Sequence, residues 1–124
     1  MADELAIEDL RGFQVTLECR GCREELLGST SMLEFTLTSC AEQAGGKVVK
    51  AGTYRVDPFK ITALIVMNSG HIIAHAWAEG SYMTVDVYSH REKKFAGAVA
   101  DNLLKEFRPK VHTTKISDRI PPSY

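Results

Sequence analysis

Two histidines and a tryptophan stand close together in an apolar stretch of the sequence. His71 and His75 are separated by three residues, and Trp77 follows two residues later. In an extended strand, residues two or four apart point to the same side, so these three side chains would share one face of a sheet. Imidazoles bind and release protons near neutral pH, and an indole face attracts cations and flat rings. The row indicates either a ligand site or a pair of hydrogen-bonded structural histidines.

Two acidic residues lie near this row. Glu79 follows Trp77, and Asp86 interrupts an apolar run. A carboxylate beside an aromatic ring can hold a ribose or a sulfonium, whereas most such carboxylates lie in turns or face solvent. The sequence alone does not choose between these roles.

Cys19 and Cys22 have the C-x-x-C spacing, and with His71 and His75 they could supply four zinc ligands. The spacing between the two pairs is not that of a zinc finger, and a chain this rich in apolar residues does not need a metal to fold. Cysteines also serve as small core residues. We therefore expect no metal site.

The composition is that of an ordinary folded domain. The chain has 124 residues, of which 44% are hydrophobic and 25% charged, which suits one domain spanning residues 1–124. A net charge of −1 argues against a nucleic-acid partner. The acidic N-terminus lacks a signal-peptide pattern, and no apolar run approaches the roughly 20 residues that a membrane span needs. Three cysteines fit a reducing compartment, so we expect a cytoplasmic protein that does not bind membranes.

The hydrophobic pattern predicts the elements that must position these residues. Alternation of apolar and polar residues predicts strands at 13–18, 48–54, 61–67, 72–76, 82–88 and 111–116. Helical spacing predicts helices from about 30 to 44 and from 96 to 107, the first capped by a residue among 29–31, carrying Phe35 on its apolar side, and stopped by Gly45-Gly46.

This order predicts an α+β two-layer sandwich, in which an antiparallel β-sheet carries both helices on one face. The other face would be open. We expect Trp77 and Met83 to line it, which would make it a ligand or subunit surface.

Several segments resemble the short bacterial and archaeal S-adenosylmethionine decarboxylases. Residues 75–82, His-Ala-Trp-Ala-Glu-Gly-Ser-Tyr, resemble that family's His-Thr-Trp-Pro-Glu followed by a Gly-Tyr turn. Residues 85–88, Val-Asp-Val-Tyr, resemble its Val-Asp-Val-Phe, and residues 18–22, Glu-Cys-Arg-Gly-Cys, resemble its Glu-Phe-Tyr-Gly-Cys. The likeness runs from about residue 12 to residue 88 and more loosely to the end, and it implies the S-adenosylmethionine decarboxylase-like fold.

The resemblance also assigns roles to individual residues. The family cuts its own chain at Glu-Ser-His, and the serine becomes a pyruvoyl group that acts as the electron sink for decarboxylation. Ser69-Gly70-His71 lies over that sequence, so Gly70 takes the serine position and has no hydroxyl. His75 matches the histidine that assists processing, and His90 replaces the cysteine that donates a proton. On this basis the catalytic candidates are Ser69, His75 and His90, and the ligand-binding candidates are His71, Trp77 and Glu79.

The resemblance therefore implies a homodimeric protein of polyamine (spermidine) metabolism. This protein would bind S-adenosylmethionine or a related small molecule. It would not cut itself and would carry no pyruvoyl cofactor. Three alternatives stay open. The chain could be an active decarboxylase whose pyruvoyl group comes from Ser69. It could be a lyase without a cofactor that uses His71, His75 or His90 as a base, or an inactive subunit that regulates an active paralogue.

Overall fold

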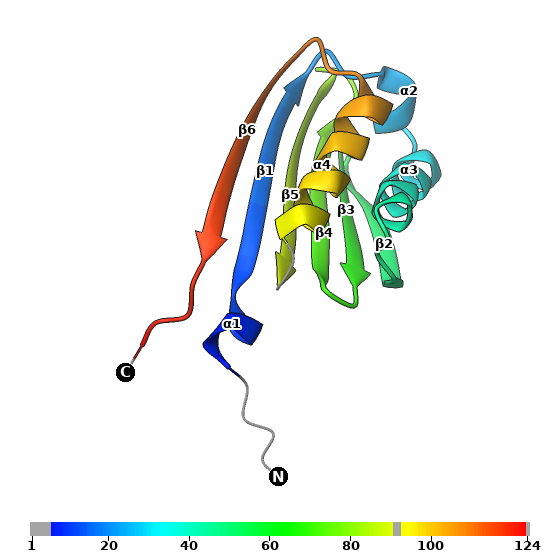
Figure 1. The fold of residues 1–124 in the computed structure, drawn as a ribbon. Coiled ribbons are helices and arrows are strands. Elements are labelled where there is room, and N and C mark those ends of the chain that lie inside the picture. Colours follow the sequence, from blue (N-terminus) through cyan, green and yellow to red (C-terminus); the bar gives the residue numbers. More distant parts are fainter. Residues whose placement is uncertain (1–5, 91–92, 124) are drawn as a thin grey trace.

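Six strands form one antiparallel sheet, and two long helices cover one of its faces (Figure 1). The computed structural model describes residues 6–90 and 93–123. Along the chain the elements are α1 (Ile7–Leu10), β1 (Gly12–Arg20), α2 (Glu24–Leu27), α3 (Thr30–Gln43), β2 (Val48–Asp57), β3 (Lys60–Met67), β4 (Gly70–Trp77), β5 (Tyr82–His90), α4 (Lys93–Phe107) and β6 (Val111–Arg119). The predicted α+β sandwich is confirmed, and α1 and α2 are short helices that the sequence pattern did not predict.

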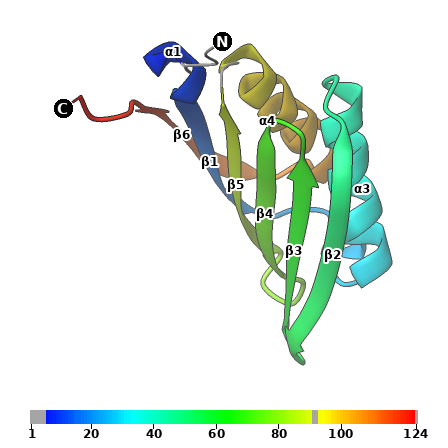
Figure 2. The same ribbon diagram turned by 90° about the horizontal axis from the view of Figure 1, so that it is seen from below.

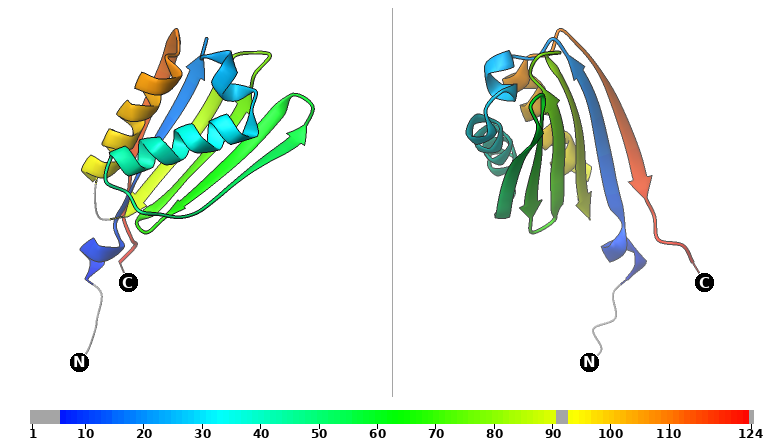
Figure 3. Two further views of the ribbon diagram at one scale, coloured as in Figure 1. Left: turned by 90° about the vertical axis from the view of Figure 1, so that its right-hand side faces the viewer. Right: turned by 180° about the vertical axis from the view of Figure 1, so that it is seen from behind.

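The strand order is β2-β3-β4-β5-β1-β6 (Figure 2). The strands from β2 to β5 follow one another as hairpins, whereas β1 lies between β5 and β6 and pairs antiparallel with both. Helix α3 packs on β2 and β3, and α4 packs on β1 and β5, so both helices lie on the same side (Figure 3). No helix of the described residues covers the opposite side of the sheet, which we call the open face.

The ends of α3 follow from its terminal residues. The Ser29 hydroxyl accepts a hydrogen bond from the Met32 N–H at 3.2 Å, which caps the first turn. Gly45 has φ +97°, and the N–H groups of Gly45 and Gly46 bond back to carbonyls of the last turn. Both predicted end signals are confirmed. Phe35 was wrongly placed on the apolar side, because it is 68% exposed and points away from the sheet.

Alternation along the strands divides the side chains between the two faces. In β4 the buried residues are Ile72, Ala74 and Ala76, and they face the helices. Met83 is fully buried on this side, so its predicted place beside Trp77 on the open face was wrong. The reason is the register, because Trp77 pairs with Tyr82 and therefore shares a face with it rather than with the next residue.

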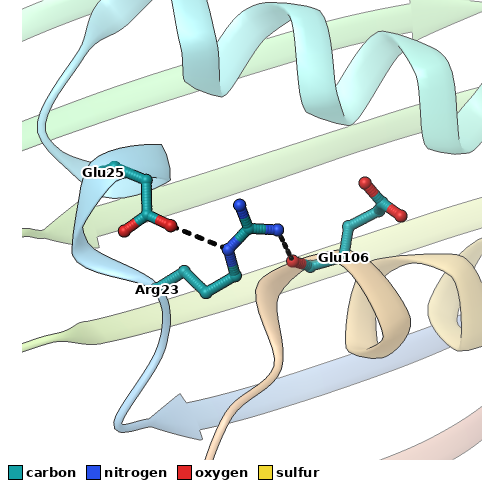
Figure 4. Close-up of polar contacts among 3 residues, drawn as sticks. All are labelled: Arg23, Glu25 and Glu106. Atoms are coloured by element: carbon teal, nitrogen blue, oxygen red, sulfur yellow. Dashed lines mark hydrogen bonds and ion pairs between the residues drawn. The ribbon is translucent and has the colours of Figure 1, made fainter.

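An arginine joins the segment after β1 to the end of α4 (Figure 4). The Arg23 guanidinium lies 2.8 Å from a carboxylate oxygen of Glu25 and donates to the Glu106 carbonyl at 3.3 Å. The Arg23 N–H also donates to the Phe107 carbonyl at 3.0 Å. A cation at the C-terminus of a helix is favourable because the last carbonyls have no partner within the helix. This contact holds the Arg20–Arg23 turn against the helical layer.

Candidate functional site

The aromatic and polar side chains singled out in the sequence gather on the open face. His71 pairs with Tyr88, His75 with Thr84, and Trp77 with Tyr82 across β4 and β5. Each of these side chains is half-buried, between buried neighbours that point to the helices. The structure thus places the two histidines and the tryptophan on one face, as their spacing indicates, and adds two tyrosines to the row.

One end of the open face carries the position of the missing serine. Ser69 lies in the turn between β3 and β4, and its carbonyl accepts a hydrogen bond from the His90 N–H at 2.9 Å. Gly70 pairs with Ser89 on β5. A Cβ atom on Gly70 would overlap the carbonyl oxygen of Tyr88 and lie 2.7 Å from its carbonyl carbon. Any residue with a side chain at position 70 would require the backbones of β4 and β5 to move apart, and only glycine avoids this.

Beside this turn, two aromatic rings stack on each other and an arginine lies over one of them. The His71 and Tyr88 rings stack with centroids 5.6 Å apart and planes inclined at 25°. The Arg119 guanidinium lies 5.4 Å from the centre of the Tyr88 ring. A Cβ on Gly12 would be 2.6 Å from Cζ of that ring. Tyr88 is therefore held by three neighbours, and a shallow hollow of about 330 Å³ opens between it and the tail beyond β6.

The other end of the open face contains a larger hollow, of about 620 Å³. Its lining is Arg20, Phe59, Trp77, Glu79, Gly80 and Tyr82. The Trp77 and Tyr82 rings lie with centroids 5.3 Å apart, and the Lys60 ammonium lies 5.3 Å from the centre of the Trp77 ring. We call this the Trp77 hollow.

His75 lies between the two ends. Its Nδ1 is 3.0 Å from the hydroxyl of Thr62, which is its cross-strand partner on β3. Burial lowers the pKa of His75, the nearby Lys60 charge lowers it further, and Asp86 acts in the opposite direction. The imidazole is therefore more strongly held in its neutral form at pH 7 than an exposed histidine.

The candidate residues divide into two groups. Ser69, Gly70, His71 and His90 meet at one end of the sheet, whereas Trp77 and Glu79 belong to the other. Gly70 and Trp77 are the first and last residues of β4, and a strand of this length separates them by roughly 23 Å. One copy of the chain therefore does not bring both groups to the same small molecule.

The cysteines do not join the histidines. Cys19 and Cys22 are buried on the helical side, whereas His71 and His75 lie on the open face. The hydrogen bond between the two thiols, with burial, raises the pKa of Cys19, and the same bond lowers the pKa of Cys22. Within residues 6–90 and 93–123, no three His, Cys, Asp or Glu side chains are grouped to hold a metal ion. In the same ranges, no helix is long and apolar enough to span a membrane.

Sequence reasoning missed five residues of this site, namely Arg20, Phe59, Lys60, Tyr82 and Tyr88. The two tyrosines have the same alternation as Asp86 in β5, so the pairing of adjacent strands could have identified them. Arg20 and Lys60 come from β1 and β3, and only the strand register places them beside Trp77.

Comparisons with known proteins agree with this fold. The S-adenosylmethionine decarboxylase family model matches residues 13–120. The S-adenosylmethionine decarboxylase proenzyme of Prochlorococcus marinus is 28% identical over 112 residues, which are 90% of each chain. The proenzyme of Thermococcus gammatolerans is 26% identical over 106 residues, covering 85% of this chain and 74% of the relative. The crystal structure of the adenosylmethionine decarboxylase from Aquifex aeolicus superimposes with a TM-score of 0.83 at 20% identity, covering 90% of this chain and 92% of that one, which shows a shared fold.

Proposed function

Since the chain belongs to the S-adenosylmethionine decarboxylase family, we propose that it binds S-adenosylmethionine, or a related sulfonium nucleoside of polyamine metabolism, without cutting itself. The observation that carries this proposal is the Trp77 hollow. Its volume of about 620 Å³ lies in the usual range of small-molecule sites. Its rings offer stacking surfaces for a purine, and Glu79 offers a carboxylate for ribose hydroxyls.

The residues at the processing position do not fit a pyruvoyl group. Gly70 has no hydroxyl that could attack the preceding carbonyl, and its Cα lies against the backbone of Tyr88. Gly70 therefore supplies no electron sink for decarboxylation at this position. What the described side chains can do is bind and orient a ligand, with His75 as a neutral imidazole near the hollow.

The binding proposal predicts ligand-dependent stabilisation that requires Trp77. At a ligand concentration about ten times the Kd, the melting temperature of the protein should rise by about 3 °C or more. Trp77→Ala should abolish this rise because it removes the largest ring of the hollow. Differential scanning fluorimetry with S-adenosylmethionine and its decarboxylated form measures both values.

Phe35→Ala is the matched control, because Phe35 is an exposed aromatic residue on α3, away from the open face. It should leave the ligand-dependent rise intact. If no sulfonium nucleoside at millimolar concentration stabilises the parent protein, the Trp77 hollow is not the site of such a ligand.

We further propose that the protein is a homodimer whose subunits pack their open faces together. The β3 part of this face exposes apolar side chains. Leu64 lies opposite Ile73 and Val66 lies opposite His71, whereas Asp86 of β5 lies on the other side of Ile73. Two copies packed in opposite directions would bring the Gly70 end of one beside the Trp77 end of the other, which one copy does not do alone.

This dimer predicts a solution mass of twice the chain mass by light scattering. Leu64→Lys should produce monomers, because it places a charge at the centre of the packed face. Phe35→Lys, on the helical side, should remain a dimer. A parent protein that stays monomeric at about 0.1 mM would contradict this arrangement.

A further inference from the structure

Lys60 brings a positive charge to the edge of the Trp77 hollow. The Lys60 ammonium already lies over the Trp77 ring, 5.3 Å from its centre. The indole face that the sequence indicated for a cationic ligand is thus partly taken by a cation of the protein itself. A second positive charge on this ring would meet repulsion from Lys60, whereas an anionic group near it would be attracted.

Arg20 supplies a second cation at the same place. It is the last residue of β1, its Cα pairs with Tyr82 on one side and Val111 on the other, and its side chain lines the hollow. The Lys110 N–H donates to its carbonyl at 2.9 Å, and its backbone is fixed between β5 and β6. Because the backbone is fixed, the position of the guanidinium changes only through rotations of the Arg20 side chain.

The Arg20 guanidinium has capacity for a ligand. The ion pairs within residues 6–90 and 93–123 are Arg11 with Asp118 and Arg23 with Glu25, and Arg20 belongs to neither. The nearest carboxylate along its own strand, Glu18, accepts a hydrogen bond from the Thr84 hydroxyl.

We propose that Arg20 determines specificity by binding the carboxylate of the ligand's amino-acid group in the Trp77 hollow, and that the protein therefore prefers S-adenosylmethionine to its decarboxylated form. This inference rests on the proposed function and adds the chemical group that is recognised. A guanidinium matches a carboxylate with two parallel hydrogen bonds.

Calorimetric titration of the full chain with both ligands tests the inference. The parent protein should bind S-adenosylmethionine about ten-fold more tightly than the decarboxylated form, because one charge-assisted contact is lost in the latter. Arg20→Gln should remove this preference while changing the affinity for the decarboxylated form by less than about two-fold. Arg20→Lys should retain part of the preference, because it keeps the charge and loses the paired geometry.

Arg55→Gln is the control, since Arg55 is an exposed arginine whose guanidinium donates to the Gly28 carbonyl away from the hollow. It should leave the preference unchanged. Equal affinity of the parent for the two ligands, or a preference that survives Arg20→Gln, would overturn the role of Arg20 and leave the binding proposal standing. Binding of neither ligand would overturn both.

Discussion

Purified from a heterologous host, the protein should be a single uncut chain with the mass of all 124 residues, apart from removal of Met1 by the host. Self-cleavage by an acyl shift from nitrogen to oxygen requires a hydroxyl on the residue that follows the scissile bond. Gly70 stands where the family's serine would stand, and it has none. Intact-mass spectrometry after storage at 37 °C measures this directly.

Ser69, the residue before Gly70, carries a hydroxyl that could replace that of the missing serine, and the product of cleavage there is distinct. Cleavage there would fall between Asn68 and Ser69 and give fragments 1–68 and 69–124, the second with a carbonyl group that borohydride reduces. The turn is held on both sides, because the Asn68 N–H donates to the Lys47 carbonyl at 3.0 Å and the Ser69 carbonyl accepts from His90 at 2.9 Å. Those two fragments, absent from Ser69→Ala, would contradict the uncut chain and support an active decarboxylase.

Much of this structure could be predicted because side chains alternate between the two faces of a strand. His71, His75 and Trp77 share a face because residues two and four apart in a strand must do so, whatever the sheet around them. The cap at Ser29 and the stop at Gly45 are likewise local, since a hydroxyl at a helix start and a glycine with positive φ at its end act on adjacent backbone groups.

What the sequence did not predict depends on register between strands that are distant in the chain. Arg20 meets Tyr82 only because β1 inserts between β5 and β6, and no local pattern specifies that insertion. Met83 was placed on the wrong face for the same reason, because its face depends on whether Trp77 pairs with residue 82 or 83. The separation of the candidate residues into two ends also follows from the pairing, since Ser69 and His90 meet across the sheet while Trp77 lies a strand length away.

Gly70→Ser should destabilise the folded protein by about 1 to 3 kcal/mol, the usual cost of inserting atoms into a well-packed place. The reason is steric. The new Cβ would overlap the Tyr88 carbonyl oxygen and lie 3.0 Å from the Ser89 Cα, and both are backbone atoms that cannot rotate away. Urea denaturation followed by circular dichroism measures the free energy of unfolding.

Gly97→Ser provides the matched control, because a Cβ at Gly97 on α4 would meet nothing within 4 Å. It should be neutral or slightly stabilising, since glycine is a poor residue within a helix. A Gly70→Ser variant as stable as the parent would show that β4 and β5 can separate at this point without cost.

The same substitution, combined with His90→Cys, tests whether the processing machinery survives around the missing serine. The carbonyl that a serine at position 70 would attack belongs to Ser69, and the His90 N–H already donates to its oxygen at 2.9 Å. A donor at that oxygen stabilises the negative charge that develops during attack. Slow cleavage between residues 69 and 70 is therefore the expected result by mass spectrometry, since the strain at the Tyr88 carbonyl is relieved when the bond breaks. A double variant that stays uncut for days would show that the loss of processing extends beyond the two replaced side chains.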